Sequence, residues 1–345
     1  MIERTEEQIM KNWSVKNTNS PIVSIRCLAY NHENYIERAL NGFLIQETTF
    51  PFEIIIHDDA STDNTAKIIR KYEKKYPKII KPIYEVENQY SKKDDSLRKI
   101  MNTHIHGKYV ALCEGDDYWI SNDKLEKQIN FMEKHPEYTM SFHAANYVDN
   151  GKILSNDRKF KKECDISAKI IIEGGGDYCA TASLCYKREY DFIFPKYRLM
   201  ADIGDYPLQI LLATSGKVHY FPEIMCNYEI GNHNSWTHKI QQYEKKVQHW
   251  KTEISWLKCF NELTEFKYRT SVNNRFVLYY IELYYLGAMD IQQVKNEINK
   301  EISKIEKNRM LIKFYKYRMK KWFKKYIPFL YKILASGYHV VKKIR

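Results

Sequence analysis

Two short acidic clusters each follow directly on an apolar run, and this pattern constrains the fold more than any other feature of the chain. The run 53–56 leads into the first cluster, His57–Asp63, and the run 109–113 leads into the second, Glu114–Trp119. Runs of this kind predict buried strands of a parallel sheet. Ligand sites of open α/β sheets lie outside the carboxyl ends of the strands, so we expect both clusters at one functional edge. Adjacent carboxylates suit Mg²⁺ or Mn²⁺, which commonly joins protein carboxylates to phosphates, and the pattern therefore indicates a metal and a nucleotide.

Strand and helix signals alternate through the first 145 residues. Asp63 is a candidate N-cap for one of the predicted helices, and residues 121–123 offer caps for another. The alternation predicts βαβ units and hence an α/β fold with a mostly parallel sheet flanked by helices. The predicted strands lie at 22–28, 53–57, 79–86 and 109–113, and the predicted helices at 36–44, 63–72, 97–104 and 121–136.

The pattern weakens after residue 150. Gly174–Gly176 is interpreted as a turn, because a phosphate-binding loop would need a strand before it and a helix after it in a tighter motif. Apolar residues at spacings of three and four predict amphipathic helices at 240–257 and 291–305, and a more uniformly apolar helix is predicted at 276–286. These segments predict a C-terminal helical region.

The basic charge is concentrated at the C-terminal end. The formal net charge is +12, and residues 311–345 contain eleven Lys or Arg and no Asp or Glu. Within this tail, residues 313–326 interleave basic and aromatic side chains, a composition that suits an interfacial helix on anionic lipid. A solvated basic extension and a nucleic-acid-binding tail remain the alternatives. We favour the membrane surface.

Other features bear on the compartment. The N-terminus lacks the apolar stretch of a signal peptide, and no run of about 18 uncharged apolar residues predicts a membrane-spanning helix. The seven cysteines form no CxxC pair, which favours buried thiols in a reducing cytosol. We therefore expect a cytoplasmic protein held peripherally at the inner face of the cell membrane.

Three segments in order resemble family-2 glycosyltransferases, which have the GT-A (Rossmann-like) fold. Residues 54–65 are similar to the DDxSxDxT segment of that family, 21–36 to its opening strand and turn, and 114–119 to its metal-binding DxD variant. The resemblance covers roughly residues 20–145 and implies a sugar transferase that uses a nucleotide-sugar, UDP-linked in the first instance. From the resemblance and from the helical and basic segments described above, we expect a leader at 1–20, a GT-A domain at 21–238, a helical region at 239–310 and the basic tail at 311–345.

The resemblance also implies roles for individual residues. Tyr30 matches the aromatic residue that packs on the nucleotide base, and Asp59 the carboxylate that hydrogen-bonds it. Asp116 matches the position facing the ribose and sugar, and Asp117 the ligand of Mn²⁺ or Mg²⁺. His233 lies in a late loop that resembles one closing over the pyrophosphate, where it would reach the metal or a phosphate.

Inverting members of the family need a base for the acceptor hydroxyl, and Asp205 stands at the matching position, with Asp202 as the alternative. Each assignment also has a structural interpretation. An acid just before Pro207 suits a helix start, and Asp58 and Asp63 are interpreted as caps. Trp119 is interpreted as core packing, and Thr181 is a weaker candidate for contact with the acceptor.

Taken together, the sequence predicts an inverting, metal-dependent glycosyltransferase. Its acceptor would be a hydroxyl of a saccharide or lipid-linked molecule in surface-polysaccharide synthesis, with an anionic membrane as the expected partner rather than nucleic acid. A nucleotidyltransferase would also use a metal and a nucleotide, but residues 29–32 do not supply its basic phosphate loop. A non-enzymatic basic membrane- or nucleic-acid-binding protein would leave the acidic motifs without a role.

Overall fold

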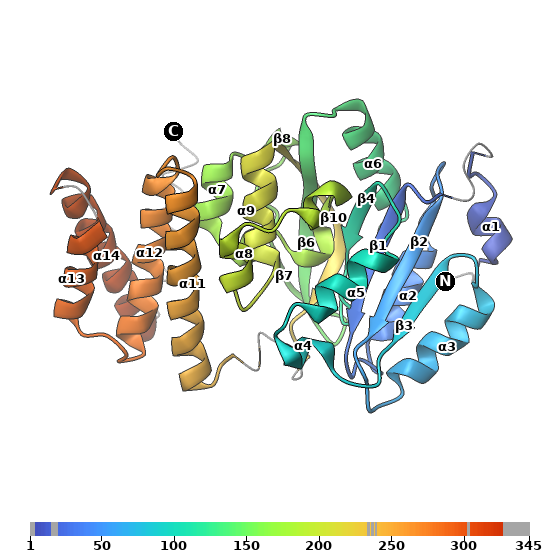
Figure 1. Ribbon diagram of the computed structural model, residues 1–345, viewed down its shortest axis with the longest axis horizontal. Helices are drawn as coiled ribbons and strands as arrows, with labels where there is room; N and C mark the ends of the chain where they lie inside the picture. Colours follow the sequence, from blue (N-terminus) through green and yellow to red (C-terminus); the bar gives the residue numbers. More distant parts are fainter. Residues whose placement is uncertain are drawn as a thin grey trace. The chain divides into compact units, whose positions relative to one another are not determined.

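A computed structural model describes residues 4–14, 20–232, 235, 238, 240–301 and 304–326. Its internal contacts divide the chain into two compact units. The first comprises Met1–Arg198 and Ile203–Lys239, and the second comprises Leu199–Asp202 and Ile240–Arg345. Figure 1 labels most of the elements of both units.

The first unit begins with alternating helices and strands, as the hydrophobic pattern predicts. Its N-terminal half contains α1 (Glu6–Met10), β1 (Val23–Ala29), α2 (Ile36–Leu44), β2 (Phe52–Asp58), α3 (Thr65–Lys75), β3 (Ile80–Tyr84), α4 (Gln89–Lys92), α5 (Ser96–His104), β4 (Tyr109–Leu112), β5 (Tyr118–Trp119) and α6 (Lys124–Lys134). Its C-terminal half contains β6 (Tyr138–Asp149), β7 (Lys152–Asn156), β8 (Cys164–Asp165), α7 (Ala168–Gly174), β9 (Cys185–Lys187), α8 (Lys196–Met200), α9 (Asp205–Ser215) and β10 (Lys217–Glu229), with α8 running into the second unit.

The strands form one mixed sheet in the order β3-β2-β1-β4-β9-β6-β10-β5, with β7 on β6 and β8 on β10. Strands β3, β2, β1 and β4 are parallel, as are β6 and β10, whereas β9 and β5 run antiparallel to their neighbours. The predicted α/β fold with a mostly parallel sheet is confirmed. Ala29 at the end of β1 pairs with Asp58 at the end of β2, so the loops that follow these two strands emerge side by side.

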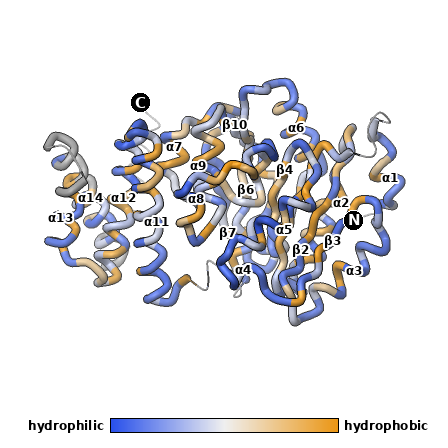
Figure 2. Tube along the Cα trace, viewed as in Figure 1, coloured by the Kyte–Doolittle hydropathy of each residue, from blue (hydrophilic) through white to orange (hydrophobic). Residues whose placement is uncertain are grey.

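One apolar core fixes the helices of the N-terminal half against the sheet. It joins the strand residues Ile25 and Ile54 to Phe43 of α2, Ile69 of α3 and Ile129 of α6. The strands in Figure 2 carry the orange of apolar residues, whereas α3 is mostly blue. The difference arises because α3 buries only one stripe of its surface, whereas a strand of the parallel sheet is buried on both faces.

The later part of the first unit contains strands that the sequence did not predict. Strand β6, of 12 residues, lies at the end of the region of clear alternation, and β10, of 13 residues, lies beyond it. They mix polar residues with apolar ones, and β10 has register shifts near Pro222, which hide the period of two. All seven cysteines are free, and five of them are buried.

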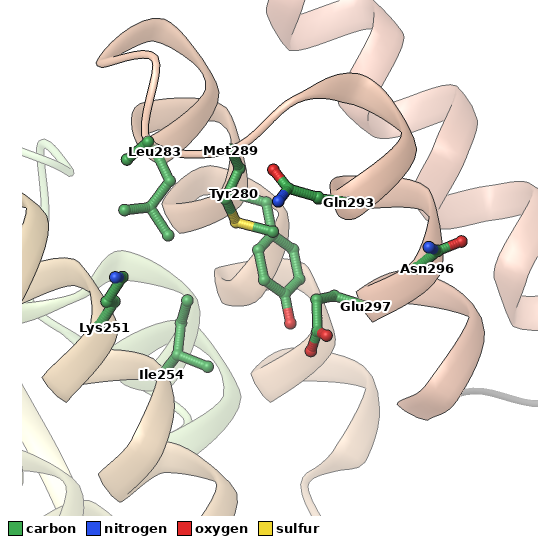
Figure 3. A pocket seen from close by; sticks show the side chains of 9 residues that line it. Lys251, Ile254, Tyr280, Leu283, Met289, Gln293, Asn296 and Glu297 are labelled. Atoms are coloured by element: carbon green, nitrogen blue, oxygen red, sulfur yellow. The ribbon is translucent and has the colours of Figure 1, made fainter.

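The second unit contains four helices among its described residues: α11 (Tyr243–Leu263), α12 (Arg269–Tyr285), α13 (Ile291–Glu301) and α14 (Lys304–Tyr326). The single helix predicted at 291–305 therefore ends at Glu301, and α14 begins at Lys304. Helices α11, α12 and α13 line a pocket of about 440 Å³ whose walls include Ile254, Leu283 and Met289 (Figure 3). Among the described residues, no helix has the length and apolar content needed to cross a bilayer.

Candidate active site

The loops after β1 and β2 are tied together by hydrogen bonds between residues about thirty positions apart. The Thr62 amide donates to Asn31 Oδ1 at 2.8 Å, and the Asn31 amide donates to Ser61 Oγ at 2.9 Å. Asn31 has a φ of 56°, a left-handed conformation that Asn tolerates better than most residues. The ties hold the loop that carries Tyr30 beside the loop that carries Asp59.

Asp59 lies at the carboxyl end of β2 and is 5% exposed. Its Oδ1 accepts the Gln89 amide at 2.6 Å, and its Oδ2 accepts the Tyr90 amide at 3.1 Å. The Asp59 carboxylate thus holds the first turn of α4 against the end of the sheet. Each oxygen has a second lone pair, so these bonds leave room for a further donor such as a base N–H.

The other two acids of the first cluster hold the loops in place. Asp63 accepts the Thr65 amide at 2.9 Å and the Glu33 amide at 3.0 Å, so its side chain binds the start of α3, but the N-cap position is Asn64, one residue later than predicted. Asp58 is buried, and this burial raises the pKa of its carboxyl, while the neighbouring Ser61 opposes the rise. Most of the first cluster therefore builds the loops rather than offering free carboxylates.

The second acidic cluster forms the turn between β4 and β5. Asp117 is 2% exposed, and its Oδ1 accepts the Glu229 amide at the end of β10 at 2.8 Å. Burial and, after it, the neighbouring Asp116 raise the pKa of Asp117 well above its usual value. A buried carboxylate beside other acids is the environment in which a bound cation stabilises the charged form.

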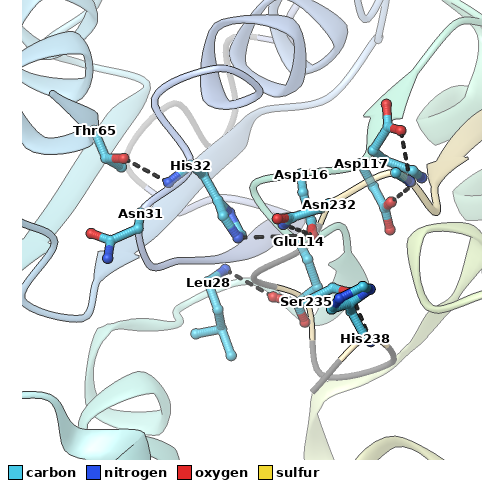
Figure 4. A network of polar contacts seen from close by, with 12 residues as sticks. Leu28, Asn31, His32, Thr65, Glu114, Asp116, Asp117, Asn232, Ser235 and His238 are labelled. Carbon is cyan, nitrogen blue, oxygen red and sulfur yellow. Dashed lines mark hydrogen bonds and ion pairs between the residues drawn. The ribbon is translucent and has the colours of Figure 1, made fainter. Parts of the chain in front are cut away.

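Asp116 lies at the centre of a polar network that joins three loops (Figure 4). Asn232 Nδ2 donates to Asp116 Oδ2 at 2.8 Å, and His32 Nε2 lies 3.8 Å from the same oxygen. Gly115 allows His32 to approach, because a Cβ at Gly115 would lie 2.8 Å from His32 Nδ1. The loops after β1, β4 and β10 therefore converge on this carboxylate.

The pKa of Glu114, the first residue of the second cluster, responds to the charges of several neighbours. Burial raises the pKa of Glu114 to about 7; Arg26 opposes this shift, and the charges of Asp116 and Asp205 add to it. The Leu28 amide donates to Glu114 Oε2 at 3.3 Å. Asp205 is thus close enough to the second cluster for its charge to be felt there.

Asp205 is the first residue of α9. Its Oδ1 accepts the Tyr206 amide at 2.7 Å, and its Oδ2 accepts the Thr181 hydroxyl at 3.2 Å. Burial raises the pKa of Asp205, and both hydrogen bonds act in the opposite direction. The helix-start interpretation is therefore confirmed, and it is compatible with a catalytic role for the same carboxylate.

Comparison with known proteins shows which family the part of the chain with the two acidic clusters matches. Residues 24–188 match the family model described as glycosyl transferase family 2. This part of the chain belongs to that family. The match contains β1, both acidic clusters and Thr181, and it ends before Asp205.

Relatives and solved structures extend the comparison beyond those residues. The chain is 34% identical over 233 residues to "Uncharacterized protein Rv1520" of Mycobacterium tuberculosis, covering 67% of this chain and 64% of the relative's length. It is 29% identical over 176 residues to the Escherichia coli glucosyltransferase WfgD, whose full name specifies a UDP-Glc donor and an α-D-GlcNAc-diphosphoundecaprenol acceptor; 50% of this chain and 64% of WfgD are covered.

Two solved structures share the fold. TarS of S. aureus in complex with UDP-GlcNAc has a TM-score of 0.54 at 18% identity, covering 80% of this chain and 78% of that one. The mannosyltransferase PcManGT of Pyrobaculum calidifontis, in complex with GDP-Man and Mn²⁺, has a TM-score of 0.52 at 16% identity, covering 94% and 86%. These likenesses confirm the predicted GT-A fold.

Family membership does not assign the remaining candidates, but the structure describes most of them. Asp202 lies in the second unit, where His249 Nδ1 is 3.0 Å from its Oδ2. Trp119 is buried, and its indole N–H donates to the Ala182 carbonyl at 2.9 Å, so its interpretation as core packing is confirmed. His233 lies outside the described residues.

Two neighbours of the second cluster were missed by the sequence-based reasoning. Glu229 follows an apolar stretch of β10 and therefore carries the same signal as the two clusters, an acid at a strand end. Its Oε1 accepts the Asn150 amide at 2.9 Å, and its Oε2 lies 3.2 Å from Arg38 Nη2. Asn232 had no such signal, because its contact with Asp116 spans 116 residues.

The donor set suits the predicted metal. Asp116 and Asp117 offer oxygen ligands from adjacent residues, the donor type that Mg²⁺ and Mn²⁺ prefer. Glu229 is already paired with Arg38, which leaves the two adjacent acids as the better ligands. The polar atoms around them position the carboxylates in the way that outer-shell partners orient metal ligands.

Proposed function

We propose that the protein is an inverting, metal-dependent glycosyltransferase. It would transfer a sugar from a nucleotide-sugar to a hydroxyl of a saccharide or lipid-linked acceptor. A UDP-sugar is the donor that we favour. The observation that carries this proposal is the adjacent acid pair Asp116–Asp117 at the turn between β4 and β5, where the Asn232 side chain donates to Asp116 and the Glu229 amide donates to Asp117.

The donor would bind across the loops after β1, β2 and β4. Tyr30 would pack on the base, Asp59 would accept a base N–H, and Asp116 would face the ribose and sugar. The tie between Asn31 and Thr62 would keep the first two groups in register. The UDP-GlcNAc and GDP-Man in the titles of the two structural neighbours support a nucleotide-sugar of one of these types.

Asp117, assisted by Asp116, would hold Mn²⁺ or Mg²⁺. When bound, the cation supplies positive charge that offsets the negative charge growing on the departing diphosphate. Asp117 itself must be ionised to serve as a ligand, and its burial beside other acids makes that ionisation depend on the cation.

Asp205 would act as the base. Its carboxylate would take the proton of the acceptor hydroxyl as the new bond forms at the anomeric carbon and the bond to the nucleoside diphosphate breaks. Attack from the face opposite the leaving group inverts the anomeric centre. Thr181 would orient the carboxylate through its 3.2 Å hydrogen bond.

The location of the reaction is also part of the proposal. A lipid-linked acceptor, as in the name of the E. coli relative, would place the enzyme at the cytoplasmic face of a membrane. The role would then be a step in the synthesis of a surface polysaccharide.

A donor screen tests the proposal. Purified protein with Mn²⁺ is incubated with a panel of UDP- and GDP-sugars and with saccharide and polyprenyl-diphosphate acceptors, and nucleotide release is measured. We expect one donor to be turned over in a metal-dependent manner. Release of no nucleotide from any donor–acceptor pair would contradict the proposal.

Two aspartate variants then test the base. Asp205→Asn should lower kcat by about 10²–10⁴-fold while leaving nucleotide affinity within about twofold, because a general base contributes about that much. Asp202→Asn is the matched control and should keep near-normal turnover, since Asp202 contacts His249 instead. If Asp202→Asn lost activity and Asp205→Asn kept it, the base would be Asp202.

A further inference from the structure

Helix α14 packs against α12 through one well-defined face. Phe314 is 1% exposed, and its ring lies 6.1 Å from that of Tyr284. The Tyr285 hydroxyl donates to the Arg318 carbonyl at 2.7 Å, and Lys321 Nζ lies 2.6 Å from Glu282 Oε1. These contacts fix which side of α14 faces the rest of the second unit.

A different side of α14 presents four large apolar or aromatic residues to solvent. Ile312 is 55% exposed, Tyr315 38%, Met319 54% and Trp322 42%. Their spacing of three, four and three residues places them in one stripe on a helix of 3.6 residues per turn. We call these four residues the α14 stripe. Single exposed apolar residues are common on protein surfaces, but an aligned row of four is not.

Basic residues border the α14 stripe. Lys316 and Lys320 are exposed and follow Tyr315 and Met319, so at 100° per residue they lie along one edge of the stripe. Over the whole of α14 there are ten Lys or Arg and one Glu. The helix thus combines an apolar row with positive charge, the pattern of a helix that lies in the plane of an anionic membrane interface.

We propose that the α14 stripe, with Lys316 and Lys320, is a docking surface for an anionic lipid bilayer. The apolar side chains would enter the boundary between headgroups and acyl chains, and the lysines would contact lipid phosphates. The stripe covers about 15 Å of helix, from the rise of about 1.5 Å per residue, which suits a helix lying on the surface. The proposal stands on α14 alone and holds or fails whether or not the protein transfers a sugar.

The lysines distinguish lipid from the other possible occupants. A second copy of the chain docked through the same stripe would bring like charges together, which opposes association. A nucleic acid would use the lysines but would leave Ile312 and Met319 without a favourable environment. An anionic bilayer satisfies both parts of the surface.

Vesicle flotation tests the proposal with the full-length chain. The protein is mixed with phosphatidylcholine vesicles or with phosphatidylcholine vesicles containing phosphatidylglycerol, and the bound fraction is measured. We expect binding to the mixed vesicles that is at least tenfold stronger than to the neutral ones. The variant Met319→Glu/Trp322→Glu should abolish binding. Lys316→Gln/Lys320→Gln should weaken it about 30-fold, because each basic residue near an anionic surface contributes about fivefold, the equivalent of about 1 kcal/mol.

A matched control removes two exposed apolar residues elsewhere. Ile153→Ser/Leu154→Ser changes a pair that is 58% and 52% exposed on β7, and it should bind vesicles like the unchanged protein. Trp322 provides a second readout: its emission should shift to the blue on mixed vesicles, and the shift should be missing in Trp322→Phe. This readout separates insertion from simple electrostatic adsorption.

Three results would overturn the proposal. Vesicle binding unaffected by Met319→Glu/Trp322→Glu would mean that the α14 stripe is not the surface. Dimerisation that the stripe variant abolishes, without any vesicle binding, would assign the face to a second copy. Binding to DNA that is lost in the lysine variant and kept in the stripe variant, again without vesicle binding, would assign the basic residues to nucleic acid.

Discussion

The hydrogen bonds between the loops after β1 and β2 depend on Asn31, so replacing this residue should have two effects that can be measured separately. Asn31→Ala removes the acceptor of the 2.8 Å bond from the Thr62 amide and places an alanine at a φ of 56°. The lost hydrogen bond costs about 0.5–1.5 kcal/mol. The left-handed backbone costs about 1–2 kcal/mol for a residue with a Cβ. We therefore expect a loss of about 1.5–3.5 kcal/mol in the free energy of unfolding.

Asn31→Gly removes the same hydrogen bond but adopts the left-handed conformation without steric cost. Its loss should be about 1 kcal/mol, and the difference between the two variants isolates the backbone strain. Urea unfolding measures both values, provided that the slope m is unchanged. Titration calorimetry with a nucleoside diphosphate and Mn²⁺ should show affinity several-fold weaker in both variants, because the loops carrying Tyr30 and Asp59 are no longer tied.

Two results would refute this reasoning. Equal losses of stability in the alanine and glycine variants would mean that the left-handed conformation at Asn31 carries no strain. Unchanged nucleotide affinity in both would mean that the loop tie does not organise the nucleotide side of the site.

The remaining predictions concern the base, the metal and the packing beneath it. Burial raises the pKa of Asp205, so kcat should begin to fall on acidification at a higher pH than it would for an ordinary aspartate. Thr181→Val removes a hydrogen bond that lowers this pKa, so it should move the acid limb of the pH–rate profile to higher pH. Thr181→Ser keeps the hydroxyl and should leave the profile unchanged. Chelation of divalent cations should abolish turnover, and the Mn²⁺ affinity measured by calorimetry should weaken as pH falls, because protons compete for Asp117 with its raised pKa. Gly42→Ala would place a Cβ 2.7 Å from the Trp119 backbone and should cost about 1–3 kcal/mol by urea unfolding as well as weakening Mn²⁺ binding. Gly204→Ala, where a Cβ meets nothing within 4 Å, is the control for stability.

Sequence patterns located the acidic edge because strand ends carry a local signal. An apolar run followed by acids identifies β2 and β4 without knowledge of the fold, and parallel pairing then brings Asp59 and Asp117 to one edge. The same signal was present at Glu229, but β10 contains polar residues and Pro222, so its period of two is broken. Glu229 was therefore missed because β10 could not be recognised as a strand, although an acid at a strand end does mark this edge of the sheet.

Roles within the acidic clusters were harder to predict, because they depend on distant partners. Asp59 and Asp63 have the same chemistry and similar sequence surroundings, yet Asp63 accepts amides two and thirty residues away, and Asp59 accepts amides at the start of α4. The contact of Asn232 with Asp116 joins segments 116 residues apart. No local pattern encodes such a pairing, since it arises only when the loops converge.

The two clusters differ in how their negative charge is compensated, and this difference explains why only the second calls for a cation. In the first cluster, burial acts to raise the pKa of Asp63, but the hydrogen bonds from the Thr65 and Glu33 amides outweigh it and lower that pKa, whereas Asp58 keeps a pKa raised by burial. In the second, burial and mutual repulsion dominate, so the pKa of Glu114 rises to about 7 and that of Asp117 rises well above its usual value. An acid whose pKa is raised in the folded state costs stability as pH rises from its unfolded-state pKa, and the cost is complete only above the folded-state pKa. For Glu114, the metal-free edge therefore destabilises the fold most above about pH 7. A divalent cation bound there would reverse this by favouring the ionised form of the same carboxylates, and the proposed metal binding would then be coupled to folding at the edge where the nucleotide would sit.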